Sequence, residues 1–295
     1  MYAAIEMGGT KVLIAAGTSP DDLSPPVRLP TTDPQSTIAA IIAELQRLQS
    51  LQRPFKGIGI ATFGPVGLNP ADRTFGHILT TPKKGWTGTD ILGPIKQTFP
   101  DMPIALDTDV NGAAMGEAHW GAGRGLKNFA YVTVGTGIGV GVVINGQPVH
   151  GLLHPEAGHI SVKRHPADAY QGGCALHGDC LEGLAAGPSV LARTGMRGED
   201  LPADHPVWSL LGDYLAQLYR SLALITSAER IIVGGGVGLH DTVLSSSRDQ
   251  LHSGLAGYIE ALKERATIDD YIVRAGLGDR AGILGAIALI RRQME

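Results

Sequence analysis

The chain has 295 residues, a formal net charge of −4, two cysteines and a hydrophobic share of 43%. That share argues against a disordered chain, and the acidic balance argues against a broad basic surface for nucleic acid. The length suggests two domains. Two cysteines cannot form a disulfide framework and the first residues lack the features of a secretory signal, so we expect a protein of the reducing cytoplasm.

Glycine-rich turns follow apolar stretches at similar places in the sequence. Residues 2–17 contain an apolar stretch, a Gly-Gly-Thr-Lys turn and a second apolar run, and residues 130–145 repeat this pattern around Gly-Thr-Gly. Each pattern predicts a β-hairpin, and the internal similarity suggests two domains of related topology. A third glycine cluster, at residues 231–238, follows a strand-like run. Glycines also interrupt the uncharged stretch 129–149, which predicts buried strands rather than a membrane span.

Four stretches between these turns have the apolar spacing of helices. They are residues 37–52, 111–120, 208–227 and 281–294. Strands that alternate with helices indicate an α/β protein with mixed sheets. Proline and aspartate are frequent in residues 20–36, and glycine, proline and aspartate in residues 195–206, so we expect surface loops in both stretches.

The first two glycine turns are candidates for phosphate binding, because glycine exposes backbone N–H groups without a Cβ in the way. Gly8, Gly9, Thr10 and Lys11 form the first turn, and Gly135, Thr136 and Gly137 form the second. Two such turns facing each other across a cleft would hold a polyphosphate. The alternative interpretation of either turn alone is a plain tight hairpin. Lys11 is either a phosphate partner or a surface lysine. The sequence contains neither a P-loop motif nor a dinucleotide-binding motif.

Asp109 follows an apolar strand and precedes a predicted helix. One interpretation is a helix N-cap, because aspartate accepts the first free N–H groups well. The other places its carboxylate at the floor of an interdomain cleft, where it accepts a proton from a substrate hydroxyl. In phosphoryl transfer, such a carboxylate mainly orients the attacking hydroxyl. Asp107, two residues earlier, is the nearest rival for this role.

Both cysteines fall in one short segment, as Cys174-x-x-His177-x-x-Cys180. One further histidine would complete a tetrahedral zinc site, and the candidates are His154, His159 and His165. Free thiols, a local disulfide, or histidines that are merely polar loop residues are the alternatives. Four protein ligands leave no open position, so the metal would be structural and a metallohydrolase is disfavoured.

Taken together, these residues resemble the ROK family of sugar kinases and repressors. The likeness runs from EMGGTK near the start to LGDRAGILGA near the end, and its most specific part is Glu156-Ala-Gly-His159 with the Cys/His segment and Glu182. Within the family, GHISVKRHPADAYQGGCALHGDCLEGLAAGP is similar to the bacterial fructokinase branch. Thr108 replaces the usual asparagine before the catalytic aspartate, and His177 replaces one of three cysteines; both departures suit that branch.

The resemblance implies an α/β, actin/hexokinase-like (ribonuclease H-like) fold of two domains with an interdomain cleft. We expect an N-terminal lobe of residues 1–112 plus 280–295 and a C-terminal lobe of residues 113–279. The family commonly forms homodimers, so a homodimer is expected. Its repressors carry an N-terminal helix-turn-helix domain, whereas this sequence begins with its first strand, so we expect no binding to nucleic acid and none to a membrane.

The resemblance also implies ATP-dependent phosphorylation of a hexose at its 6-hydroxyl, with Mg²⁺, and D-fructose is the favoured substrate. Asp109 matches the general base, and the zinc ligands are His159, Cys174, His177 and Cys180. The sugar would contact Thr108, Glu156, His159 and Glu182, with backbone near Gly64 and Pro65. The nucleotide would contact both glycine turns, Pro188, Gly234, Gly235, Gly236, Val237 and Gly238. The alternatives are a kinase for glucose, mannose or N-acetylmannosamine, and a non-catalytic sugar-sensing relative.

Overall fold

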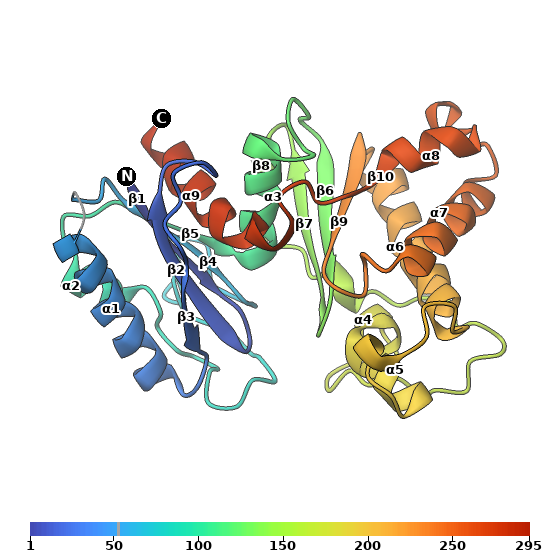
Figure 1. The fold of residues 1–295 in the computed structure, drawn as a ribbon, viewed down its shortest axis with the longest axis horizontal. Helices are drawn as coiled ribbons and strands as arrows, with labels where there is room; N and C mark the ends of the chain where they lie inside the picture. The colour runs from blue at the N-terminus through green and yellow to red at the C-terminus, as the bar shows by residue number, and fades with distance from the viewer. Residues whose placement is uncertain (52–53) are drawn as a thin grey trace. The chain divides into compact units, whose positions relative to one another are not determined.

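A computed structural model describes residues 1–51 and 54–295, and it is a mixed α/β structure (Figure 1). The contacts divide the chain into two compact units. Unit 1 comprises Met1–Arg124, Pro148–His154 and Asp279–Glu295, and unit 2 comprises Gly125–Gln147 and Pro155–Gly278. The described residues form two five-stranded sheets.

The sheet of unit 1 has the strand order β3-β2-β1-β4-β5. β1 (Tyr2–Met7), β2 (Lys11–Gly17) and β3 (Val27–Pro30) are antiparallel neighbours, whereas β4 (Ile58–Thr62) and β5 (Ile104–Thr108) run parallel to β1. The two parallel strands are almost wholly buried, as expected for strands covered by helices on both faces. Because parallel strands place their carboxyl ends at one edge, Glu6, Thr62 and Thr108 lie at the same end of the sheet.

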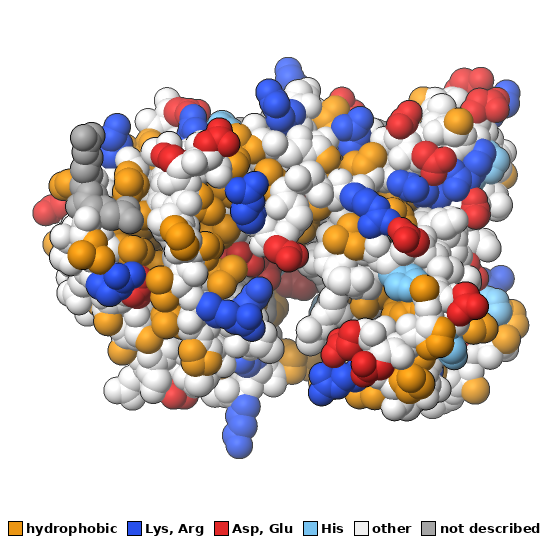
Figure 2. Space-filling model, viewed as in Figure 1, with side chains coloured by type: hydrophobic (Ala, Val, Ile, Leu, Met, Phe, Trp, Pro, Cys, Tyr) orange, Lys and Arg blue, Asp and Glu red, His pale blue; other side chains and the backbone are white. Residues whose placement is uncertain are grey.

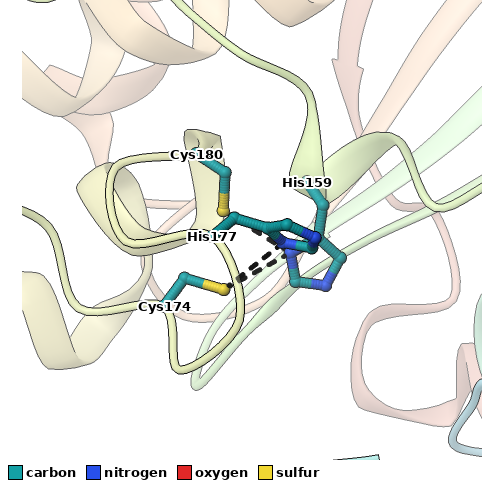
Figure 3. Close-up of side chains that lie close together, drawn as sticks. All are labelled: His159, Cys174, His177 and Cys180. Carbon is teal, nitrogen blue, oxygen red and sulfur yellow. Dashed lines mark hydrogen bonds between the residues drawn. The ribbon is translucent and has the colours of Figure 1, made fainter. Parts of the chain in front are cut away.

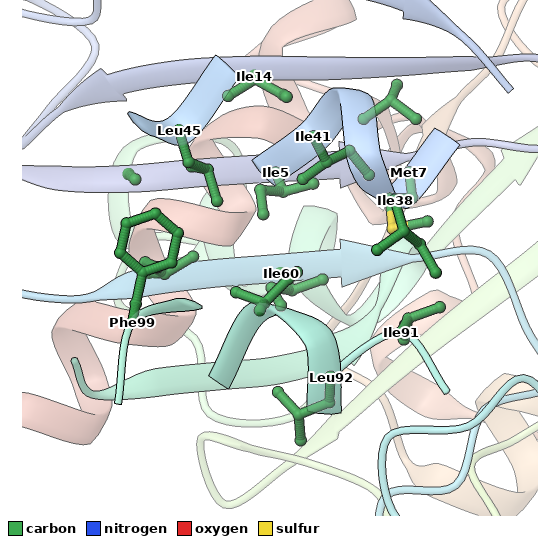
Figure 4. Close-up of a cluster of buried hydrophobic side chains, with 14 of the residues drawn as sticks. Ile5, Met7, Ile14, Ile38, Ile41, Leu45, Ile60, Ile91, Leu92 and Phe99 are labelled. Atoms are coloured by element: carbon green, nitrogen blue, oxygen red, sulfur yellow. The ribbon is translucent and has the colours of Figure 1, made fainter. Parts of the chain in front are cut away.

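Helices cover both faces of this sheet (Figure 1). α1 (Pro34–Leu51) and α2 (Gly93–Thr98) lie on one face, and α3 (Asp109–Trp120) and α9 (Ala281–Met294) lie on the other. Apolar side chains fill the space between the sheet and α1 (Figure 4). The fully buried members include Ile5, Met7, Ile14, Ile41, Leu45 and Ile60.

Glycines permit the close approach of α9 to α3 and β4. A Cβ on Gly285 would lie 2.1 Å from the carbonyl oxygen of Gly112, and a Cβ on Gly59 would lie 1.8 Å from that of Ala286.

We predict that Gly285→Ala lowers the free energy of unfolding by about 1–3 kcal/mol, because the backbone must shift to admit the methyl group. Urea denaturation checks this, with Gly151→Ala, where a Cβ has open space, as the control. Equal midpoints for the two variants would contradict the packing argument.

The sheet of unit 2 has the order β10-β9-β6-β7-β8. β6 (Phe129–Val134) and β7 (Ile138–Ile144) form an antiparallel hairpin, and β9 (Arg230–Gly234) pairs parallel to β6 on its other side. β10 (Ile272–Arg274) runs parallel to β9, and the short β8 (Gln147–Pro148) completes the sheet.

Five helices and several single turns complete the described part of unit 2. They are α4 (Leu181–Ala185), α5 (Gly187–Thr194), α6 (Val207–Thr226), α7 (Asp241–Leu255) and α8 (Arg265–Tyr271), with the turns η1 (Ala157–His159), η2 (Gly198–Asp200) and η3 (Glu260–Leu262). The turn η4 (Gly278–Arg280) leads into α9. No described helix combines the length and apolar character needed to span a bilayer. On the face shown in Figure 2, basic and acidic side chains of the described residues are interspersed.

Both predicted hairpins and all four predicted helices are present, with small shifts at their ends. α1 begins at Pro34, and Gln52, the last residue of that prediction, lies outside the described residues. The expected loop 20–36 was partly wrong, because β3 pairs with β2 there. Residues 195–206 contain only η2.

Unit 1 differs from the expected N-terminal lobe in two segments, and its last part begins at Asp279, one residue earlier than expected. It extends through α3 to Arg124, because α3 packs lengthwise on α9, whereas the expected boundary cut that helix. It also includes Pro148–His154, where Val66 donates its N–H to Nε2 of His154 at 3.2 Å.

Candidate active site

Asp109 is the first residue of α3, and it follows β5 directly. Thr108 has extended backbone angles, and its hydroxyl accepts the Asn111 N–H at 3.1 Å, so Thr108 is the N-cap. The interpretation of Asp109 as the N-cap was therefore wrong by one residue. The Asp109 carboxylate accepts the Val110 N–H at 2.9 Å and is half-buried. A helix N-terminus favours negative charge, so this position suits an ionised carboxylate.

Asp107, the rival carboxylate, is buried and its oxygens are occupied. One oxygen accepts the Thr108 N–H at 2.7 Å and the Asn111 amide at 2.8 Å, and the other lies 3.0 Å from Nε2 of His150. The hydrogen bond to Asp107 raises the pKa of His150. These contacts fix the residues on either side of Asp109, which favours a positioning role for Asp107.

Glu6 is a further candidate residue that the sequence did not single out. It lies near the end of β1, and burial, followed by the charge of Asp109, raises its pKa to about 7. Its Oε2 atom is buried and has no hydrogen-bond partner among the described residues. A Cβ on Gly282 would lie 2.4 Å from the Glu6 carboxyl carbon, so glycine is needed where α9 begins. The signal in the sequence was a single acid in an apolar strand, two residues before a glycine turn.

The two glycine turns close in a similar way within their own units. The Gly8 N–H donates to the Lys11 carbonyl at 2.8 Å, and the Gly135 N–H donates to the Gly137 carbonyl at 2.9 Å. The first N–H of each turn therefore stabilises the turn itself. The middle residues, Gly9 and Thr136, are exposed.

Gly64 and Pro65, the expected backbone contacts of the sugar, follow β4 in unit 1 and are joined by a cis peptide bond. Leu79 donates its N–H to the Pro65 carbonyl at 2.7 Å. This segment follows β4, and Thr108 is the last residue of the neighbouring parallel strand β5, so both lie at the same end of the sheet.

Unit 2 contains a cavity of about 550 Å³ beside the second glycine turn. Five of its lining residues were predicted to contact a nucleotide, namely Gly135, Thr136, Pro188, Gly236 and Val237. Gly234, Gly235 and Gly238 do not line it. A Cβ on Gly235 would lie 2.4 Å from the Val134 carbonyl oxygen, and a Cβ on Gly234 would lie 2.4 Å from the Tyr131 hydroxyl oxygen. These two glycines therefore allow their backbone to pack closely against β6.

Two aromatic rings of this cavity were not predicted. Trp208 and His240 stack with their ring centroids 4.1 Å apart and their planes at 18°. The indole N–H donates to the Pro202 carbonyl at 2.9 Å, which fixes the orientation of the stack. Burial lowers the pKa of His240, which favours the neutral imidazole. A flat, neutral surface of this kind suits a planar base.

The four predicted zinc ligands come together in unit 2 (Figure 3). The ligand atoms of His159, Cys174, His177 and Cys180 all lie within 4.8 Å of one another, and both cysteines are free. The Nδ1 atom of His159 is 3.5 Å from the Cys180 sulfur and 3.7 Å from the Cys174 sulfur, and Nδ1 of His177 is 3.7 Å from the Cys174 sulfur.

These spacings fit a tetrahedral metal. Zinc bonds of about 2.3 Å to sulfur and about 2.0–2.1 Å to nitrogen separate two ligands by roughly 3.6 Å. The other candidate histidines are placed elsewhere: His154 accepts the Val66 N–H, and Nδ1 of His165 accepts the Ala167 N–H at 3.2 Å. Among the three candidates, the described structure thus brings His159 to the cysteines.

The predicted sugar-binding residues of unit 2 lie beside this cluster. Nε2 of His159 is 4.0 Å from one carboxylate oxygen of Glu182. Partial burial and the charge of Glu182 raise the pKa of Glu156 to about 7. Glu156, His159 and Glu182 therefore form one polar group in unit 2, while Thr108, Asp109, Gly64 and Pro65 belong to unit 1.

The chain is similar to known proteins over almost its whole length. The family model "ROK family" matches residues 2–293. A fructokinase of Pediococcus pentosaceus is 39% identical over 295 residues, covering 100% of this chain and 99% of the relative. A fructokinase of Zymomonas mobilis is 41% identical over 293 residues, covering 98% and 96%.

Solved structures agree on the fold. The ROK hexokinase from Thermus thermophilus superposes with a TM-score of 0.78 at 24% identity, covering 99% of this chain and 98% of the other. The expected two-domain, actin/hexokinase-like α/β fold is thereby confirmed, as is the resemblance on which it was based. This chain belongs to the ROK family.

Proposed function

We propose that this protein is an ATP-dependent fructokinase, which transfers the terminal phosphoryl group of ATP to the 6-hydroxyl of D-fructose. The observation that carries the proposal is the full-length similarity to several fructokinases at about 40% identity. An aspartate at a helix N-terminus supplies the carboxylate that such a transfer needs.

In this proposal Asp109 aligns the attacking hydroxyl and takes up its proton as the phosphoryl group moves. The Thr108 cap and the Asp107 network hold the start of α3, and so they hold this carboxylate in place. Glu156, His159 and Glu182 bind sugar hydroxyls, together with Thr108 and the backbone at Gly64 and Pro65.

The nucleotide binds in the 550 Å³ cavity, with its base against the Trp208–His240 stack and its phosphates toward the Gly135–Thr136–Gly137 turn. The first turn, from Gly8 to Lys11, is the second phosphate-binding turn of this proposal. Mg²⁺ neutralises phosphate charge and prefers oxygen ligands. The buried, unpartnered Oε2 atom of Glu6 fits such an ion.

A structural zinc ion held by His159, Cys174, His177 and Cys180 fits the spacing of these ligand atoms. Four protein ligands leave the ion no position for substrate, so its contribution is to order the loop. We further propose a cytoplasmic homodimer, as is common in the family.

An assay of ADP release with ATP, Mg²⁺ and a panel of sugars tests the function. We predict that fructose gives a kcat/KM more than about 10-fold above glucose, mannose and N-acetylmannosamine, since misplaced hydroxyls leave polar groups of the site unpaired. A higher value for another hexose would overturn the choice of sugar. Tight fructose binding without ADP release from any sugar would instead favour a sensor.

A further inference from the structure

In unit 2, residues 182–187 contact both ends of the second glycine turn, Gly135-Thr136-Gly137. One oxygen of Glu182, Oε2, accepts the Ile138 N–H at 3.0 Å, just after the turn. Gly187 donates its N–H to the Gly135 carbonyl at 2.7 Å, at the start of the turn. Glu182 lies in α4 and Gly187 is the first residue of α5, so one short stretch of chain fixes the turn from both sides.

The fit between this segment and the turn is tight. A Cβ on Gly137 would lie 2.7 Å from Oε2 of Glu182, and a Cβ on Gly187 would lie 3.0 Å from the Gly135 carbonyl. Any larger residue at Gly137 would therefore push the carboxylate away from Ile138. Both contacts depend on glycine at these positions.

The segment is itself well anchored. Leu181 donates its N–H to the Ile160 carbonyl at 3.0 Å, and Leu184 and Ala186 donate to the carbonyls of Cys180 and Glu182. Cys180, which precedes α4, is buried and belongs to the Cys/His cluster. These hydrogen bonds fix the backbone that carries Glu182, so its carboxylate can hold the turn in one conformation.

A turn with two glycines loses more conformational freedom than other sequences when it is ordered. If a ligand must order the turn, that loss reduces the binding affinity; if the protein has already ordered it, the affinity is retained.

We propose that Glu182 is a positioning residue for nucleotide binding: its Oε2 atom holds the phosphate-binding turn in shape. The Oε1 atom, 4.0 Å from His159, is left for the sugar, so the two oxygens have separate tasks. The inference rests on the proposed function, because it takes the turn to bind the phosphates of ATP.

The test is calorimetric titration of the full-length protein with ADP and Mg²⁺ in the absence of sugar. Glu182→Ala should weaken ADP binding about 10-fold, because the hydrogen bond from Ile138 that holds the turn is lost. Glu182→Gln keeps an acceptor for Ile138 and should bind ADP within about 2-fold of the wild type. As the control, Glu156→Ala removes a neighbouring sugar-binding carboxylate and should also stay within about 2-fold, whereas its sugar KM rises.

Gly137→Ala perturbs the same contact from the side of the turn, and it carries the test if Glu182→Ala does not fold. It should weaken ADP binding more than Gly151→Ala, because Gly151 does not line the cavity and a Cβ there meets no atom within 4 Å. Unchanged ADP affinity in both Glu182→Ala and Gly137→Ala would overturn the inference. A wild-type protein that does not bind ADP would instead contradict the proposed function.

Discussion

Replacing Asp109 by asparagine is expected to lower kcat by about 10²–10⁴-fold while fructose binding changes little. Asparagine has the same size, and the N-cap of α3 is Thr108, so the helix start should persist. The amide cannot accept a proton from the attacking hydroxyl. Steady-state ADP release gives kcat, and calorimetric titration gives the fructose affinity.

Asp107→Asn is the matched control for this substitution. It changes the same chemical group two residues earlier, in a side chain whose oxygens accept from Thr108 and Asn111 and face His150. Its main effect should be a loss of about 1–3 kcal/mol in the free energy of unfolding, since an NH₂ group replaces one oxygen and the remaining oxygen cannot serve both the Thr108 and Asn111 donors and His150. If Asp109→Asn kept the full rate, Asp109 would not be the base.

The second large effect is expected at the Cys/His cluster. Cys174→Ala should abolish zinc binding and lower the free energy of unfolding by more than about 4 kcal/mol, the scale on which metal loss acts. For a domain of this size such a loss shifts Tm by roughly 8–16 °C. Cys174 is partly exposed, so without a metal its truncation would change little. Metal analysis and thermal unfolding measure the two quantities.

His165→Ala serves as the comparison, because His165 was a candidate ligand but lies outside the cluster. It should keep its zinc and a Tm close to that of the wild type. A wild-type protein that is free of metal, with a Cys174→Ala variant of equal Tm, would refute a structural zinc site.

The hairpins and helices could be predicted from local sequence patterns, because each of these elements forms between residues that are close together in the chain. The glycine turns and the periodicity of residues 281–294 are of this kind, and α9 has the predicted bounds. β3 was missed because its residues, VRLP, form a strand only by pairing with β2. The N-cap was misassigned by one residue because Thr108 and Asp109 are both good capping residues, and the backbone angles decide between them.

The candidate site also combines residues that a local motif marks with residues that only the fold brings together. Three ligands of the Cys/His cluster lie within a few residues of one another, so their spacing alone indicated a metal. The choice of His159 over His154 and His165 depends on how distant segments fold together. Trp208 lies in α6 and His240 immediately precedes α7, and no local motif marks them. Glu6 was visible as an isolated acid, and only its burial beside Asp109 revealed its importance.

Phosphorus NMR of the product formed from fructose, ATP and Mg²⁺ tests the central proposal most directly. We predict equal amounts of ADP and fructose 6-phosphate from the wild type, and almost none from Asp109→Asn over the same time. Fructose 1-phosphate, inorganic phosphate in place of a sugar phosphate, or undiminished product from the variant would contradict it.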